Sequence, residues 1–129
     1  MTGFVEVRTF EHAHSDNRRK ILECNFLTSS VQYFTIMEKL PLGNHFHKER
    51  HETFVIASGG GKCCYVTVDE DGVPNGEQIT LPVRQGSVIQ IHPLTAHAFL
   101  LEPGSTMLCF SSIPFDSENQ DMFAFQLQM

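Results

Sequence analysis

The stretch GNHFHKERHETFVIASGGG, residues 43–61, holds two histidines one residue apart, then a glutamate, then an apolar run that ends in glycines. Residues two apart on a strand share a face and lie about 7 Å apart along the chain. His45 and His47 should therefore point the same way, and Glu52 should share the inward face of the next strand with Phe54. A buried anion is costly unless it is paired or ligated. A cation held by the imidazoles and the carboxylate would satisfy it.

A second histidine cluster lies farther along, in SVIQIHPLTAHAFL, residues 87–100. Pro93 ends one apolar run, and His97 begins the next and shares a face with Phe99. His97 can therefore supply a third imidazole, with His92 as the alternative. Three imidazoles and a carboxylate suit one divalent transition metal, Zn, Fe, Mn, Ni or Cu, better than Mg or Ca, which prefer oxygen ligands.

The rest of the chain consists of short β-branched and aromatic runs, with no long run at helical spacing. Turn-forming pairs of Gly, Pro, Asn and Asp separate these runs. The pattern predicts strands over residues 4–10, 31–40, 44–49, 52–58, 62–69, 78–83, 87–92, 97–102 and 105–112. So many short strands must close or pack as two sheets, which predicts an all-β chain with a jelly-roll β-barrel.

Length and charge limit the classes of function. A chain of 129 residues fits a single domain, residues 1–129. Its formal charge of -6 has the wrong sign for binding nucleic acid or an anionic membrane. It shows neither a signal-like start nor an apolar run long enough to cross a bilayer. We therefore expect a soluble, cytoplasmic protein with no nucleic-acid or membrane partner, whose four cysteines stay reduced.

Together these motifs resemble those of the cupin superfamily. The first cupin motif, His-x-His followed by Glu and Gly, is matched by His45, His47, Glu52 and Gly59. The looser second motif is matched in order by Gly86, Pro93 and His97. The resemblance covers about residues 31–112. It implies a double-stranded β-helix fold, with His97 completing the metal set.

A finer resemblance suggests a kind of substrate. Residues 43–61 and the stretch MLCFSSIPFDSENQDMFAF, residues 107–125, are similar to cupins of bacterial nucleotide-sugar pathways, both keto-sugar isomerases and the cupin domain of capsular-polysaccharide reductase/epimerases. This implies a small-molecule substrate, a sugar or nucleotide sugar, and metal-assisted proton transfer next to a ketone. Because one fold hosts many reactions, two alternatives stay open: a non-haem iron dioxygenase and a non-catalytic ligand-binding cupin.

The remaining polar residues give weaker indications. The candidate catalytic base is His92, followed by Tyr65 and Glu49. We expect His51 at the surface or the barrel mouth, because it alternates with Glu52. The second His-x-His, at residues 12 and 14, has no carboxylate partner nearby, and we do not expect it to bind metal.

The two ends of the chain indicate self-association. FVEVRTF, residues 4–10, and FAFQLQM, residues 123–129, add more apolar surface than one small barrel needs to close. Exposed sheet edges would otherwise invite uncontrolled pairing. We therefore expect a homodimer, with the tail docked on the barrel or on the partner subunit.

Overall fold

The described part of the chain is built from β-strands. A computed structural model describes residues 11–26, 29–113, 118 and 120–129, so the strand predicted over residues 4–10 lies outside the described residues. The strands are β1 (Glu11–Ser15), β2 (Arg19–Phe26), β3 (Ser29–Ile36), β4 (Leu42–Phe46), β5 (Glu52–Ser58), β6 (Gly60–Thr67), β7 (Ile79–Arg84), β8 (Val88–Ile91), β9 (Thr95–Leu101), β10 (Thr106–Ser111) and β11 (Phe123–Ala124). Within these ranges, no helix is long and apolar enough to cross a membrane.

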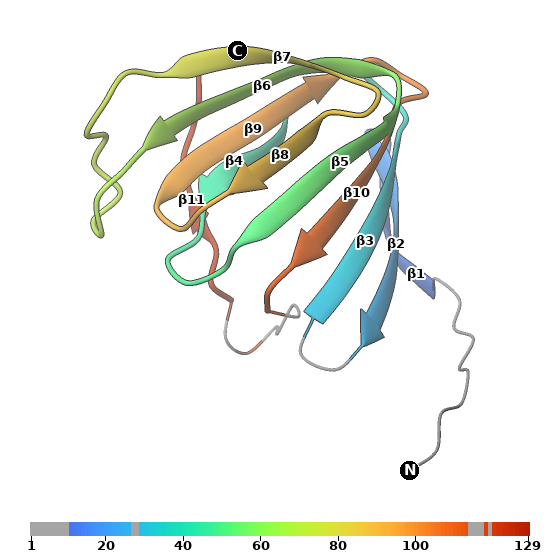
Figure 1. The fold of residues 1–129 in the computed structure, drawn as a ribbon, viewed down its shortest axis with the longest axis horizontal. Helices are drawn as coiled ribbons and strands as arrows, with labels where there is room; N and C mark the ends of the chain where they lie inside the picture. Colours follow the sequence, from blue (N-terminus) through green and yellow to red (C-terminus); the bar gives the residue numbers. More distant parts are fainter. Residues whose placement is uncertain (1–10, 27–28, 114–117, 119) are drawn as a thin grey trace.

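The strands form two antiparallel sheets that pack face to face (Figure 1). The six-stranded sheet has the order β1-β2-β3-β10-β5-β8, and the five-stranded sheet has the order β11-β4-β9-β6-β7. The apolar faces of both sheets are buried between them, as two-layer folds require. The prediction of an all-β, jelly-roll fold is confirmed.

The core between the sheets follows the two-residue alternation of the strands. In β5, Glu52, Phe54 and Ile56 are buried while their neighbours are more exposed, which matches the predicted inward face. Phe99 in β9 packs against Phe54 from the opposite sheet, with ring centroids 4.8 Å apart. The four cysteines form no disulfide, and Cys63, Cys64 and Cys109 lie in the buried interior.

The hairpin β1–β2 was not predicted from the sequence. Every residue of β1 is exposed, so this edge strand lacks the apolar alternation that marks a half-buried strand. Its turn is formed by Asp16, whose Oδ1 accepts hydrogen bonds from the backbone N–H groups of Arg18 and Arg19 at 2.8 and 3.0 Å. The hairpin extends the six-stranded sheet beyond β3 and forms one wall of the site described below.

The C-terminal tail docks on the chain's own five-stranded sheet. Strand β11 pairs with β4, where Phe123 stacks on Phe46 with ring centroids 5.3 Å apart. Leu127 is only 2% exposed, and its N–H donates to Oδ1 of Asn44 at 3.1 Å. The tail therefore contacts the barrel of its own chain.

Candidate metal centre

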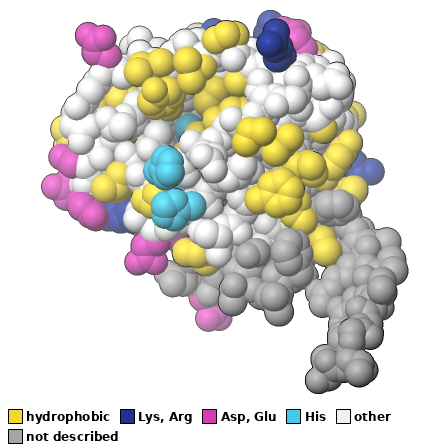
Figure 2. Space-filling view, in the orientation of Figure 1, with side chains coloured by type: hydrophobic (Ala, Val, Ile, Leu, Met, Phe, Trp, Pro, Cys, Tyr) yellow, Lys and Arg dark blue, Asp and Glu magenta, His cyan; other side chains and the backbone are white. Residues whose placement is uncertain are grey.

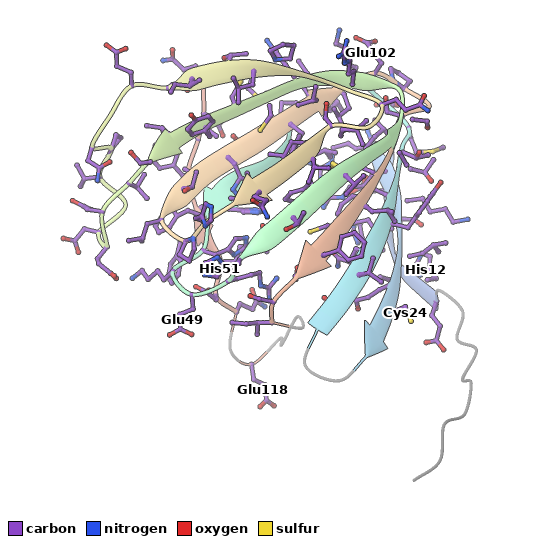
Figure 3. The ribbon with its side chains drawn as sticks, in the orientation of Figure 1. His12, Cys24, Glu49, His51, Glu102 and Glu118 are labelled. Atoms are coloured by element: carbon purple, nitrogen blue, oxygen red, sulfur yellow. The ribbon has the colours of Figure 1, made fainter. Side chains whose placement is uncertain are left out.

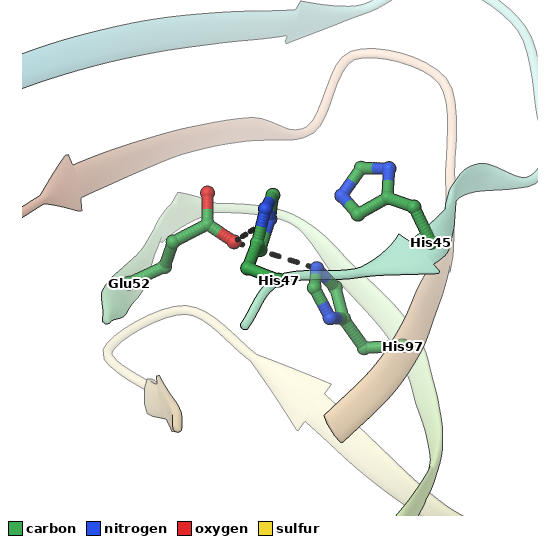
Figure 4. A group of neighbouring side chains, drawn as sticks. All are labelled: His45, His47, Glu52 and His97. Atoms are coloured by element: carbon green, nitrogen blue, oxygen red, sulfur yellow. Dashed lines mark ion pairs between the residues drawn. The ribbon is translucent and has the colours of Figure 1, made fainter. Parts of the chain in front are cut away.

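The four predicted metal ligands come together between the two sheets (Figure 4). His45 lies in β4 and His47 directly after it, Glu52 begins β5, and His97 lies in β9. One ligand atom from each residue lies within 4.8 Å of the other three. His47, Glu52 and His97 are 2%, 8% and 1% exposed, so water reaches them poorly.

A glycine lets the two histidine strands approach. Gly43 has φ +107°, and a Cβ there would lie 2.8 Å from the carbonyl oxygen of His97. The β4–β9 register shifts directly after Gly43, and His45 then stands opposite His97. Their ring centroids are 4.8 Å apart. A residue with a side chain at position 43 would strain the backbone and push the two strands apart.

Hydrogen bonds fix the tautomers of two of the imidazoles. Nδ1 of His97 donates to the carbonyl oxygen of Thr95 at 3.0 Å, and Nδ1 of His47 donates to the carbonyl oxygen of Asp121. A carbonyl can only accept, so in each neutral ring Nε2 carries the lone pair. Such bonds to the second ring nitrogen are usual for histidines that bind metals.

The lone pairs in the cluster face one another. Nε2 of His47 and Nε2 of His97 lie 3.0 and 3.5 Å from Oε1 of Glu52. All three atoms are buried, and none has a hydrogen-bond partner of good geometry among the described residues. Buried polar atoms are normally satisfied, and either a shared metal cation or a proton between His47 and Glu52 would satisfy atoms that converge in this way. The residues therefore fit a divalent transition metal of the kind that the sequence predicts.

The electrostatics keep Glu52 ionised and His45 and His97 neutral, but favour a proton on His47. Burial alone would raise the pKa of Glu52, but the neighbouring imidazoles, His47 first, lower it to about 2. Burial, with the nearby His97 and His47, lowers the pKa of His45 to about 3, and burial also lowers the pKa of His97. Burial opposes protonation of His47 as well, but the Glu52 carboxylate outweighs it and raises the pKa of His47. His47 is thus the imidazole for which a proton competes with a metal.

A buried thiol supports the carboxylate from behind. Sγ of Cys109 donates to Oε2 of Glu52 at 3.5 Å. Burial and then the charge of Glu52 raise the pKa of the Cys109 thiol well above its ordinary value, so the thiol keeps its proton. With Oε2 bonded to the thiol, Oε1 is left to face the imidazoles.

The tail holds the loop that joins the ligand strands. The carboxylate of Asp121 accepts the consecutive backbone N–H groups of Lys48, Glu49 and Arg50 at 2.7, 2.8 and 2.8 Å. Partial burial would raise the pKa of Asp121, but these three donors hold it below its ordinary value. Together with the bond from His47 to its carbonyl, Asp121 fixes both the loop and the orientation of one ligand. The sequence around Asp121 carries no signal of this role.

The other histidines lie outside the cluster. His51 and His92 are exposed, with ring centroids 5.6 Å apart, and neither lines the cavity described below. In β1, His12 contacts Oγ of Ser15 at 2.8 Å, and His14 contacts Oδ2 of Asp16 at 2.9 Å. A catalytic role for His92 stays a prediction.

The two other candidate bases also lie away from the cavity wall. Glu49 is exposed and points away from the sheets (Figure 3). Tyr65 is opposite His97 in the β6–β9 register and is half-buried, but it does not line the cavity.

A cavity of about 500 Å³ opens beside the metal cluster. Its apolar wall includes Phe34, Phe54, Phe99 and Met107. Its polar lining includes Arg19, Glu23 and Gln32. The volume lies within the usual range for small-molecule sites. The polar set was missed from the sequence, although Arg19 and Glu23 are four residues apart and so share a face once residues 19–26 form a strand.

Solved structures with the same fold include two kinds of protein. CapF in complex with the inhibitor 3-isopropenyl-tropolone superposes with a TM-score of 0.75 at 19% identity, over 94% of this chain and 35% of the CapF chain. CapF from Staphylococcus aureus, a capsular polysaccharide assembling protein, gives 0.73 at 19% identity over 94% and 33%. Pac13, a nucleoside dehydratase, gives 0.63 at 12% identity over 97% and 93%. This chain therefore spans about a third of CapF and nearly all of Pac13.

The comparisons define the class of protein by its fold. Neither protein-family profiles nor curated protein sequences match the chain. A protein from Planctomyces limnophilus shares the fold at 20% identity, with a TM-score of 0.59 over 95% of this chain and 96% of that one. At these identities the likeness concerns the fold. The chain has the fold of the cupin superfamily, and its His-His-Glu-His cluster could hold a metal.

Proposed function

We propose that this protein binds one divalent transition metal through His45, His47, Glu52 and His97 and isomerises or epimerises a keto-sugar, free or nucleotide-linked. The observation that carries the proposal is the convergence of buried, unpartnered ligand atoms beside a cavity of about 500 Å³. The substrate class is supported by CapF, which assembles capsular polysaccharide, and by Pac13, whose structures include a complex with uridine. A polysaccharide and uridine both contain sugar rings.

The metal ligands, the aromatic wall of the cavity and Glu23 would have separate roles in this reaction. A bound cation would polarise the ketone oxygen and stabilise the charge that develops when a neighbouring C–H bond is broken. The aromatic wall of Phe34, Phe54 and Phe99 excludes water from that carbon. The carboxylate of Glu23 accepts a hydrogen bond from Nε2 of Gln32 on Oε1 at 3.0 Å, which leaves Oε2 to take the proton and return it. Because Glu23 lines the cavity, we prefer it to His92 as the base.

The metal is tested by elemental analysis of protein purified without chelator or nickel resin. We expect one equivalent of metal per chain in wild type and in the control His12→Ala, which changes a histidine outside the cluster. His47→Ala should lose most of that metal. Wild-type protein that stays metal-free after soaking with Zn, Fe, Mn, Ni and Cu would contradict the proposal.

The reaction is tested by proton exchange. Metal-loaded protein is incubated in D₂O with nucleotide-linked keto-deoxy-sugars, and the ring-proton signals are followed by NMR. We expect loss of the signal from the carbon next to the carbonyl in wild type, and no loss in Glu23→Gln or His47→Ala. Oxygen uptake with an enol or thiol substrate, without exchange, would instead favour the dioxygenase. Sugar binding without either reaction would favour the binding module.

A second candidate reaction is dehydration of a sugar. It is favoured by the likeness to Pac13, which extends over nearly the whole of both chains. Loss of water begins with the same proton removal, so the same residues would serve. In the NMR experiment, dehydration would produce new olefinic signals, whereas isomerisation or epimerisation would not.

A further inference from the structure

Arg19 brings a positive charge into the cavity without a partner. It begins β2 and lines the cavity together with Ile21 and Glu23. Its Nε is buried without a hydrogen-bond partner, and no carboxylate pairs with its guanidinium among the described residues. Burial, and then the charge of Arg18, lower the pKa of Arg19, and the charge of Asp16 offsets part of that lowering; a guanidinium remains charged in proteins. A half-buried cation with no carboxylate in direct contact among the described residues is costly, so a structural role alone does not account for it.

No acidic group forms an ion pair with Arg19 among the described residues. Oδ1 of Asp16 accepts the backbone N–H groups at the turn, and its Oδ2 contacts His14 at 2.9 Å and Nη2 of Arg18 at 3.3 Å. The carboxylate of Glu23 accepts from Gln32. Glu23 also stands four residues from Arg19 on the same strand, about 13 Å along the chain. The guanidinium is therefore available to a ligand.

Hydrogen bonds of Arg18 fix the start of β2 against the segment that leads into β4. Nη1 of the preceding Arg18 donates to the carbonyl oxygen of Pro41 at 3.3 Å, just before β4 begins. The N–H of Met37 donates to the carbonyl oxygen of Arg18 at 2.6 Å. Arg19 and His45 line the same cavity.

We propose that Arg19 is an oxyanion-binding subsite that receives the acidic group of the substrate, a phosphate ester or a carboxylate, while the sugar ring extends toward the metal cluster. The planar guanidinium presents paired N–H donors that match two oxygens of either group. This inference rests on the proposed function for the position of the sugar. It narrows the substrate to an acidic sugar derivative.

The test measures binding of three related probes by isothermal titration calorimetry: glucose 1-phosphate, glucuronate and neutral glucose. The wild-type protein should bind at least one charged probe more tightly than glucose, and the better charged probe identifies the acidic group. In Arg19→Gln the affinity for that probe should fall about 10- to 100-fold, the usual loss for a charge-assisted contact. Arg84→Gln is the matched control, because Arg84 is exposed on β7 and does not line the cavity.

Several results would overturn the subsite. These are failure of both charged probes to bind, equal binding of glucose, or an unchanged affinity in Arg19→Gln. A melting temperature several degrees lower in Arg19→Gln would assign the residue a structural role, because loss of an unpaired cation should leave stability unchanged or raise it.

A chelator separates this inference from the proposed function. Arg19 contributes no ligand to the cluster, so Arg19→Gln should keep the wild-type metal content. The preference for the charged probe should also persist in EDTA-treated wild-type protein. Absence of metal together with a retained charge preference would refute the metal proposal and leave the subsite standing. Normal metal content without a charge preference would refute the subsite and leave the metal proposal standing.

Discussion

Replacing Asp121 by alanine should loosen the β4–β5 loop without changing any metal ligand. The side chain accepts three backbone N–H groups at 2.7, 2.8 and 2.8 Å. A hydrogen bond to a charged group contributes about 1.5–3 kcal/mol. Because Asp121 is partly exposed and water would replace some of these contacts, we expect a net loss of about 2–4 kcal/mol in the free energy of unfolding. For a domain of this size that lowers the melting temperature by roughly 6–15 °C.

The same substitution should weaken metal binding through His47. Nδ1 of His47 donates to the carbonyl of Asp121, and once the tail is released that acceptor is no longer held in place. Loss of such an outer contact typically lowers metal affinity about 10- to 100-fold. Thermal melting of metal-free protein and competition with a chromogenic chelator measure the two effects separately.

Asp69→Ala is a matched control for Asp121→Ala. Oδ1 of Asp69 accepts the backbone N–H groups of Asp71 and Val73 at 2.9 and 3.0 Å, in a loop after β6 that contributes nothing to the cluster. It should lower stability modestly and leave metal affinity unchanged. If Asp121→Ala binds metal as tightly as wild type, the tail does not position His47 and the reasoning fails.

The pH dependence gives a further check on Asp121. Its pKa is lower in the folded protein than in the unfolded chain, so its contribution is complete above the ordinary aspartate pKa of about 3.9 and is lost as the pH falls through the folded value. The stability difference between wild type and Asp121→Ala should therefore be constant near neutral pH and shrink in acid. A difference that persists at the acid limit would mean that the carboxylate charge is not its cause.

Three further predictions concern the cluster and the assembly. Gly43→Ala should lower the free energy of unfolding by at least about 2 kcal/mol and remove most of the bound metal, because the new Cβ would lie 2.8 Å from the carbonyl oxygen of His97. A variant with the melting temperature and metal content of wild type would contradict the close approach of the two strands. Metal affinity should rise as the pH passes through the raised pKa of His47, because the metal must displace the proton on that imidazole. Calorimetry in buffers of different ionisation enthalpy measures the proton released on binding. Binding that does not depend on pH would show that His47 carries no proton in the metal-free protein. The chain should be a homodimer at tens of micromolar, an order-of-magnitude range for a stable interface. The expected contact is the apolar surface of the six-stranded sheet (Figure 2), where Val88 of β8 and Phe110 of β10 are 62% and 42% exposed. Light scattering that reports a monomer would contradict this.

The sequence predicted those parts of the site that depend on local spacing. His45 and His47 share a face because they are two residues apart, and the alternation of β5 places Glu52 inward. His97 could be recognised because a proline ends the preceding run and a new alternation begins. Strand geometry was enough for His45, His47, Glu52 and the all-β fold, whereas the choice of His97 over His92 came from the resemblance to the cupin motifs.

The parts of the site that the sequence did not predict depend on contacts between segments distant in the chain. Asp121 acts on a loop more than seventy residues earlier in the chain, and nothing in its own neighbourhood signals that contact. Arg19 begins β2, whose hairpin partner β1 has no buried face. Without an apolar alternation in β1, the sequence did not predict the hairpin that places Arg19 at the cavity. His92 was a candidate base because an imidazole can transfer protons near neutral pH, yet it follows the last residue of β8 and is exposed.

The cluster draws its ligands from both sheets. His45, His47 and His97 belong to the five-stranded sheet or the residue that follows it, whereas Glu52 belongs to the six-stranded sheet. A cation held there would cross-link two layers that are otherwise joined mainly by apolar packing. Neither sheet alone offers the full ligand set, so capture of the metal must follow docking of the sheets during folding. Metal uptake would then report the completion of folding, and a chelator would weaken the contact between the layers before it disturbed either sheet.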